Sequence, residues 1–70
     1  MTIGESIRKA RKAKGWTQAQ LAWEAGTQTI YISFYENDRQ YPNLMNLISL
    51  ADALGVTLDD LVGRKVATDG

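Results

Sequence analysis

The sequence lacks both cysteine and histidine. Without cysteine there can be no disulfide bond, which fits a protein of the reducing cytoplasm. Without either residue type, the commonest ligands of zinc and the commonest acid–base catalyst are missing. The sequence therefore excludes a zinc site and a histidine-based catalytic site, and we expect neither a metal nor a cofactor.

Long apolar runs, internal repeats and low-complexity tracts are also missing. No segment approaches membrane-spanning length, and the N-terminus lacks the apolar core of a signal peptide, so we expect no contact with a membrane. The 70 residues suffice for one domain only. With 44% hydrophobic and 23% charged residues, the composition favours a globular fold over disorder.

The chain also has no net charge, which by itself argues against binding to nucleic acid. The charges are unevenly distributed, however, since residues 1–40 carry a net charge of +2 and residues 41–70 a net charge of −2. Five of the basic residues lie between Arg8 and Lys14. This basic block has two interpretations, a solvated helix face or part of a surface that binds a polyanion.

Capping residues and glycines predict helices. Two residue pairs match the capping box that opens a helix: Thr2 with Glu5, and Thr17 with Gln20. We expect the first helix to end at about Lys14, before Gly15, and the second to end at Gly26. Asn43 should cap a fourth helix over residues 44–54, and Thr57 a fifth that runs through Val62.

The third helix is expected from Thr27 or Gln28 to about Asn37. Its segment TIYISFY is rich in β-branched and aromatic residues, so a strand is the competing interpretation. An isolated strand between helices would have no pairing partner, which favours the helix.

The apolar spacing predicts a core that all five helices share. We expect the domain to span residues 1–63 and residues 64–70 to form a flexible tail. The expected core residues are Ile3, Ile7, Ala10, Trp16, Leu21, Ala22, Ala25, Ile32, Tyr35, Leu44, Leu47, Leu50, Ala51, Leu54, Val56, Leu58 and Leu61.

The stretch from Gln18 to Asn37 has the layout of a helix-turn-helix, in which the second helix enters the DNA major groove. Its two helical segments meet at Gly26, and the small Ala22 lies one turn before this glycine. A larger residue at position 22 would separate the crossed helices. A residue with a Cβ atom at position 26 would be strained at positive φ.

With this motif, the chain resembles the lambda-type repressor and Cro-like helix-turn-helix domains, the XRE family. The resemblance covers about residues 3–62 and rests on the segments IRKARKAKGWTQAQLA, YENDRQYP and LMNLISLADALGVTLDDLVG and on the glycine at position 26. It implies an all-α, compact five-helix bundle that binds double-stranded DNA and is not an enzyme. Such domains usually bind a pseudo-palindromic operator as a homodimer and repress transcription.

The resemblance also implies roles for individual residues. Arg11 and Glu36 match an ion pair that joins the first helix to the third, and Arg39 and Gln40 match loop residues that touch the DNA backbone. Asp38 stands where the family usually has glycine. The other expected DNA contacts are Gln18, Gln28, Thr29, Ile30, Ser33, Phe34 and Asn37.

Apolar side chains on the second and third helices leave their own role open, and those on the fifth helix predict a dimer interface. Ile30 and Phe34 lie one turn apart where the family usually has polar residues, so they contact thymine methyl groups, belong to the core, or bind a protein. With Trp23 on the outer face of the second helix, they support an alternative function, a protein-interaction module on the same fold. Crowding of apolar residues in the fifth helix predicts a dimer interface formed by Leu58, Leu61 and Val62.

Overall fold

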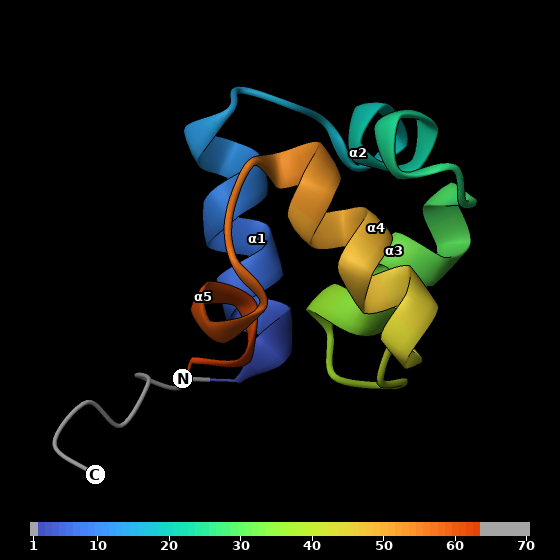
Figure 1. The fold of residues 1–70 in the computed structure, drawn as a ribbon. Coiled ribbons are helices and arrows are strands. Elements are labelled where there is room, and N and C mark those ends of the chain that lie inside the picture. The colour runs from blue at the N-terminus through green and yellow to red at the C-terminus, as the bar shows by residue number, and fades with distance from the viewer. Residues whose placement is uncertain (1, 64–70) are drawn as a thin grey trace, which may run out of the picture.

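Five helices follow one another in the computed structural model, which describes residues 2–63 (Figure 1). They are α1 (Ile3–Ala13), α2 (Gln18–Ala25), α3 (Thr29–Glu36), α4 (Leu44–Leu54) and α5 (Leu58–Val62). The predicted all-α class is confirmed, and the segment that had a strand as its alternative is α3. The predicted tail, residues 64–70, lies outside the described residues. No helix within residues 2–63 is long and apolar enough to span a membrane.

Local capping sets the helix ends at the predicted places. Both predicted capping boxes form, and Thr57 forms another with Asp60. The Asn43 side chain accepts the N–H of Asn46 at the start of α4. Gln28 is the N-cap of α3 but makes no side-chain capping hydrogen bond, so tertiary packing must stabilise this short helix.

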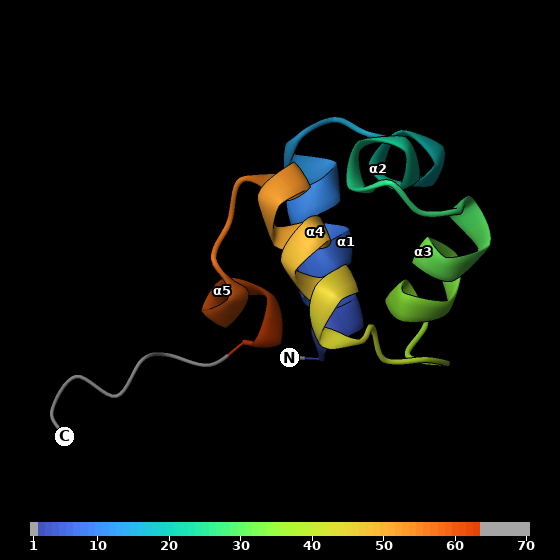
Figure 2. The same ribbon diagram turned by 45° about the vertical axis from the view of Figure 1, so that its right-hand side comes forward.

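The helices surround one core, in which α2 packs against α3 and α4, and α1 packs against α3 and α5 (Figures 1 and 2). In Figure 2, α2 and α3 lie to the right of α1 and α4, and α5 lies to the left. The buried apolar residues were all predicted from the sequence: Ile3, Ile7, Leu21, Ala22, Ile32, Tyr35, Leu47, Leu50, Ala51, Leu54 and Leu61. The predicted residues Ala10, Trp16, Ala25 and Val56 pack against this core and are partly buried.

Two predicted core residues are wrong. Leu44 is 65% exposed and Leu58 is 37% exposed, and each is the first residue of its helix. At 100° per residue, Leu44 lies about 70° from the centre of the face that α4 buries. Helix α5 is five residues long and buries only Leu61 fully.

The predicted dimer interface also needs a correction. Leu61 is 1% exposed and packs inside its own domain, so it cannot contact a second chain. The exposed flank of α5 carries Leu58, while Val62 is half-buried against the core. Leu61 is the residue with which the short helix α5 covers the core, so its side chain has no surface left for contact with a second chain.

Candidate nucleic-acid interface

A close crossing of α2 and α3 positions the candidate surface. Ala22 is buried at the crossing, and its carbonyl accepts the N–H of Thr27 at 2.9 Å. Gly26 ends α2 with a φ of +70°, and a Cβ atom built on it would meet nothing within 4 Å. Glycine is therefore needed at position 26 for its backbone conformation and not for space.

The side chains predicted to face DNA are mostly open to solvent. They lie on α3, at its N-cap and on the loop that follows it, and only Gln18 comes from α2. Six are exposed: Gln28, Thr29, Ile30, Asn37, Arg39 and Gln40. Gln18, Ser33 and Phe34 are half-buried. The structure thus brings most of the set together on one helix and one loop.

The apolar pair on α3 does not belong to the core. Ile30 is 54% exposed, and Phe34 is half-buried without joining the buried cluster. The Phe34 ring packs edge-to-face on Tyr31, with the ring centroids 6.4 Å apart. Of the three interpretations of this pair, the core is wrong, and contact with DNA or with a protein remains. Trp23 lies outside the core as well and is 83% exposed.

Asn37 is hydrogen-bonded at the end of α3. Its Nδ2 donates to the carbonyl of Ser33 at 2.9 Å, and its Oδ1 accepts from Arg8 at 3.5 Å. The carbonyl of Ser33 also accepts the backbone N–H of Asn37 at 3.0 Å, so Asn37 bonds to this carbonyl twice. Asn37 therefore stabilises the C-terminal turn of α3 and stays exposed beside Ser33.

A buried carboxylate joins three helices behind the candidate surface. The Glu36 side chain has no exposed area, and its Oε2 lies 2.7 Å from Nε of Arg11. Its Oε1 accepts hydrogen bonds from Arg11 at 3.0 Å, from Gln18 at 3.1 Å and from Arg8 at 3.4 Å. Arg11 also donates to the carbonyl of Trp16 at 2.8 Å. We call Glu36, Arg8, Arg11 and Gln18 the Glu36 cluster.

Opposing effects act on the pKa of Glu36. Burial alone would raise the pKa of this carboxyl, because desolvation disfavours its charged form. The hydrogen bonds from Arg11, Gln18 and Arg8 and the charge of Arg11 outweigh burial, and the pKa of Glu36 is lowered from its ordinary value. The same hydrogen bonding with Glu36 raises the pKa of Arg11. Both groups therefore stay charged at neutral pH.

The hydrogen bonds of Arg8 and Gln18 differ from the roles predicted for these residues from the sequence. Arg8 was counted only as part of a basic block, yet it donates to Glu36 and Asn37. Gln18 was expected at DNA, but its side-chain amide donates to Glu36. What α2 still offers an anion is the backbone N–H groups of Gln18 and Ala19 in its first turn, because the N–H of Gln20 already donates to the Thr17 hydroxyl.

The loop after α3 is fixed in place by backbone contacts. Asp38 adopts the left-handed conformation, with a φ of +58°, and its Oδ1 accepts the N–H of Gly4 at 3.3 Å. The N–H groups of Arg39 and Gln40 both donate to the carbonyl of Phe34, at 2.8 and 3.4 Å. The backbone is thus ordered while the side chains of Arg39 and Gln40 remain exposed.

Known helix-turn-helix proteins are similar to this chain in sequence. The helix-turn-helix family model matches residues 7–61. The chain is 42% identical over 69 residues to the cryptic phage CTXphi transcriptional repressor RstR of Vibrio cholerae serotype O1, covering 99% of this chain and 61% of that protein. It is 38% identical over 65 residues to the immunity repressor protein of Bacillus phage phi105, covering 93% and 45%. The chain thus spans about half the length of these relatives.

A solved structure is similar to this one over most of the chain. The P22 c2 repressor protein, in complex with a synthetic operator, is similar with a TM-score of 0.87 and 34% sequence identity, covering 93% of this chain and 98% of that chain. The family model extends from the middle of α1 to α5, and therefore includes the α2–α3 crossing and Glu36. The chain belongs to the XRE-type helix-turn-helix family.

Proposed function

We propose that this chain is the DNA-binding domain of a transcriptional repressor and reads its operator with α3. The observation that carries the proposal is the polar face at the start of α3, formed by the exposed Gln28 and Thr29 and the half-buried Ser33, beside the ordered loop that presents Arg39. Side-chain amides and hydroxyls of this kind recognise base edges in the major groove. The repressors among its relatives, and the operator in the P22 c2 complex, support the same function.

Selection of bound sites from random DNA tests the proposal directly. Repeated at two salt concentrations, it should yield one preferred sequence and an affinity that falls steeply as salt rises, because cations are released from the phosphates. Recovery of unselected sequences would contradict the proposal.

Base reading and backbone contact should separate in two variants. Gln28→Ala should relax specificity at one base position, because an amide that pairs with adenine contributes about 1–3 kcal/mol of discrimination. Arg39→Ala should weaken binding to all sequences alike, because a phosphate contact carries no sequence information. Titrations of both variants against a set of single-base operator changes measure the difference. Uniform weakening by both variants would refute these roles.

The alternative function, a protein-interaction module on the same fold, is favoured by the exposure of Trp23 and Ile30. Phe34→Ala separates the two functions. Contact with a thymine methyl group predicts that DNA affinity falls in this variant and when uracil replaces thymine at the contacted positions. Stability should drop by much less than the 3–5 kcal/mol or so lost at a buried phenylalanine, because Phe34 is only half-buried and lies outside the core.

Trp23→Ala is the matched control, since it removes an exposed aromatic ring from α2. It should leave DNA affinity unchanged. If Phe34→Ala keeps full DNA affinity and loses association with a protein, the module function replaces the repressor function.

We further propose that two chains bind a pseudo-palindromic operator through the end of the domain that carries α5. A two-fold dimer would place the two α3 helices one turn of DNA apart, about 34 Å. Leu58→Glu should abolish dimerisation on DNA, because it puts a charge on the exposed apolar flank of α5. Leu44→Glu is the control, as Leu44 is also an exposed first residue of a helix. Sedimentation that shows only monomers on a full operator would exclude the dimer.

A further inference from the structure

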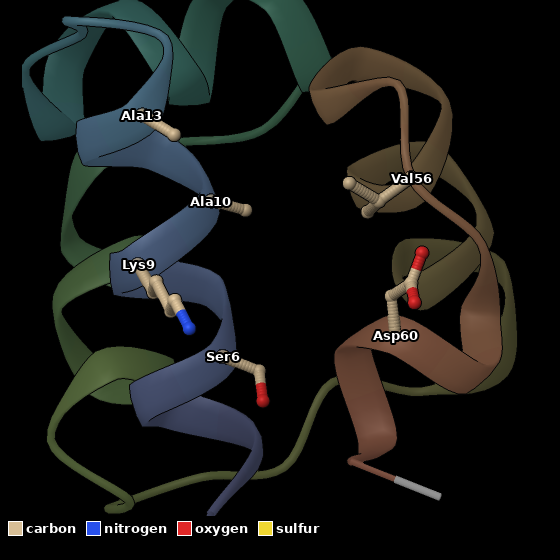
Figure 3. Close-up of a pocket in the computed structure, with 6 residues that line it drawn as sticks. All are labelled: Ser6, Lys9, Ala10, Ala13, Val56 and Asp60. Carbon is tan, nitrogen blue, oxygen red and sulfur yellow. The ribbon is translucent and has the colours of Figure 1, made fainter. Parts of the chain in front are cut away.

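A cavity of about 300 Å³ lies between α1 and the segment formed by α5 and the residues before it (Figure 3). Its lining comes from one face of α1 and from the opposite wall: Ser6, Lys9, Ala10, Ala13, Val56 and Asp60. None of the residues proposed to contact DNA is among them. The cavity has the size of the smaller ligand sites found in proteins.

Ser6 is a polar residue without a partner in this cavity. It is 6% exposed, and its hydroxyl has no hydrogen bond with any residue that the structure describes. In Figure 3 the hydroxyl points from α1 into the space that faces Asp60. A buried hydroxyl without a partner is unfavourable, and such groups call for a physical explanation. One such explanation is a bound ligand that accepts the hydrogen bond of the Ser6 hydroxyl.

Opposite charges stand on the two walls. Lys9 extends from α1, Asp60 extends from α5, and the two form no ion pair with each other within residues 2–63. One oxygen of Asp60, Oδ2, accepts the N–H of Thr57 at 3.1 Å, which fixes the carboxylate in its place. The rest of the lining is apolar and small, formed by Ala10, Ala13 and Val56. The cavity thus offers a cation, an anion and a hydroxyl around an apolar surface.

We propose that this cavity binds a small zwitterion with an apolar side group, the chemistry of an aliphatic α-amino acid. The ligand's ammonium group pairs with Asp60, and its carboxylate pairs with Lys9 and accepts the hydroxyl of Ser6. Its apolar group covers the two alanines and Val56. A ligand with a single charge would leave one of the facing charges without a partner, and this gives the selectivity. The proposal does not rest on DNA binding.

L-leucine is the probe, added to the isotope-labelled protein without DNA while backbone amide resonances are recorded. We expect saturable shifts of Ser6, Ala10, Val56 and Asp60. Isovalerate lacks the ammonium group and isoamylamine lacks the carboxylate, and each should bind roughly threefold to tenfold more weakly than leucine. Absence of saturable shifts with leucine would overturn the proposal. Equal binding of isovalerate would overturn the assignment of a zwitterion.

Three variants of residues that line the cavity test the proposed contacts, and each is measured for both folding and leucine binding. Asp60→Asn keeps an oxygen to cap Thr57 and removes the charge, and Lys9→Gln removes the opposite charge. Ala13→Met fills the cavity from an exposed position of α1. All three should weaken leucine binding, whereas Lys12→Gln, an exposed lysine that does not line the cavity, should leave it unchanged. Shifts that persist unaltered in Asp60→Asn and Ala13→Met would refute the site.

Ser6→Ala gives a signature that a purely structural serine would not. It removes the unpartnered hydroxyl and adds a better helix former, so the melting temperature should rise. Leucine binding should become weaker in the same variant. A fall in melting temperature would show that the hydroxyl stabilises the fold, and unchanged leucine binding would show that it has no part in the site. Either result counts against the proposal.

Discussion

Replacing Glu36 with alanine should lower the free energy of unfolding by about 3–5 kcal/mol, the range for breaking a buried ion pair from one side. The Glu36 side chain has no exposed surface, and Arg11 beside it is only 11% exposed. In the variant, the Arg11 guanidinium would keep its hydrogen bond to the carbonyl of Trp16 but lose both hydrogen bonds to the Glu36 carboxylate. The uncompensated charge and the loosened contact of α1, α2 and α3 account for the expected loss.

Thermal unfolding measures this effect, and a loss of this size should lower the melting temperature by more than about 10 °C. Glu24→Ala is the matched control, because Glu24 is an exposed glutamate on α2 and its loss should change stability by no more than about 0.5 kcal/mol. Arg8→Ala should have an effect between the two, as the Arg8 side chain is 41% exposed and solvent screens its charge. An unchanged melting temperature in Glu36→Ala would contradict a structural role for the cluster.

The pH dependence of stability provides an independent check of the same cluster. Because the pKa of Glu36 is lowered by folding, its contribution is complete at neutral pH. It should be lost as the pH falls below 4.5, the ordinary value for glutamate, and through the lowered pKa of the folded state. The difference in stability between the natural chain and Glu36→Gln should therefore shrink in acid. A difference that stays constant with pH would mean that the carboxylate charge is not what stabilises the folded state.

The features that local chemistry determines could be predicted from the sequence. A capping threonine and the residue three positions later lie within one turn, and a glycine after a helix adopts its left-handed conformation whatever packs around it. The helix boundaries therefore agree with the prediction to within one or two residues. Apolar spacing likewise identified every buried core residue, because a helix of known phase has one inward face.

The errors lie where phase alone does not decide. Leu44 and Leu58 continue an apolar pattern but occupy the first position of a helix, where the neighbouring helices no longer cover them. Leu61 was predicted both as a core residue and as part of the dimer interface, because the sequence does not show how completely the packing of α5 on the rest of the domain covers its side chain. The partners of Glu36 were only partly predictable. Arg11 followed from the family resemblance, whereas Arg8 and Gln18 reach Glu36 only once the helices are packed.

Gly4 is the other residue whose role appears only in three dimensions. The sequence places it in the first turn of a helix, and glycine in a helix is unfavourable by up to about 1 kcal/mol compared with alanine. The structure supplies the reason, since the start of α1 passes directly against the end of α3. A Cβ atom on Gly4 would lie 2.8 Å from the carbonyl oxygen of Glu36 and would overlap that of Tyr35. Both are backbone atoms, so neither can rotate out of the way.

Gly4→Val should therefore destabilise the protein by about 3 kcal/mol, the upper part of the range for overpacking a tight contact. The branched side chain cannot fit without separating α1 from α3, and this would also break the bond between the Gly4 N–H and Asp38. Gly4→Ala should lie between the natural chain and the valine variant, because its smaller side chain meets the same two carbonyls. Denaturant unfolding of the three proteins gives the series.

The alanine variant decides between two physical effects that have opposite signs. Helix propensity alone predicts that Gly4→Ala stabilises the protein by about 1 kcal/mol, whereas the close approach of α3 predicts a loss. Lys9→Val, at an exposed position of the same helix, measures the propensity cost of valine without a clash and should be within about 1 kcal/mol of the natural chain. If Gly4→Ala melts at a higher temperature than the natural chain, α1 and α3 are not in the tight contact described. If it melts lower, glycine at position 4 is what allows α1 to support the end of the proposed DNA-reading helix.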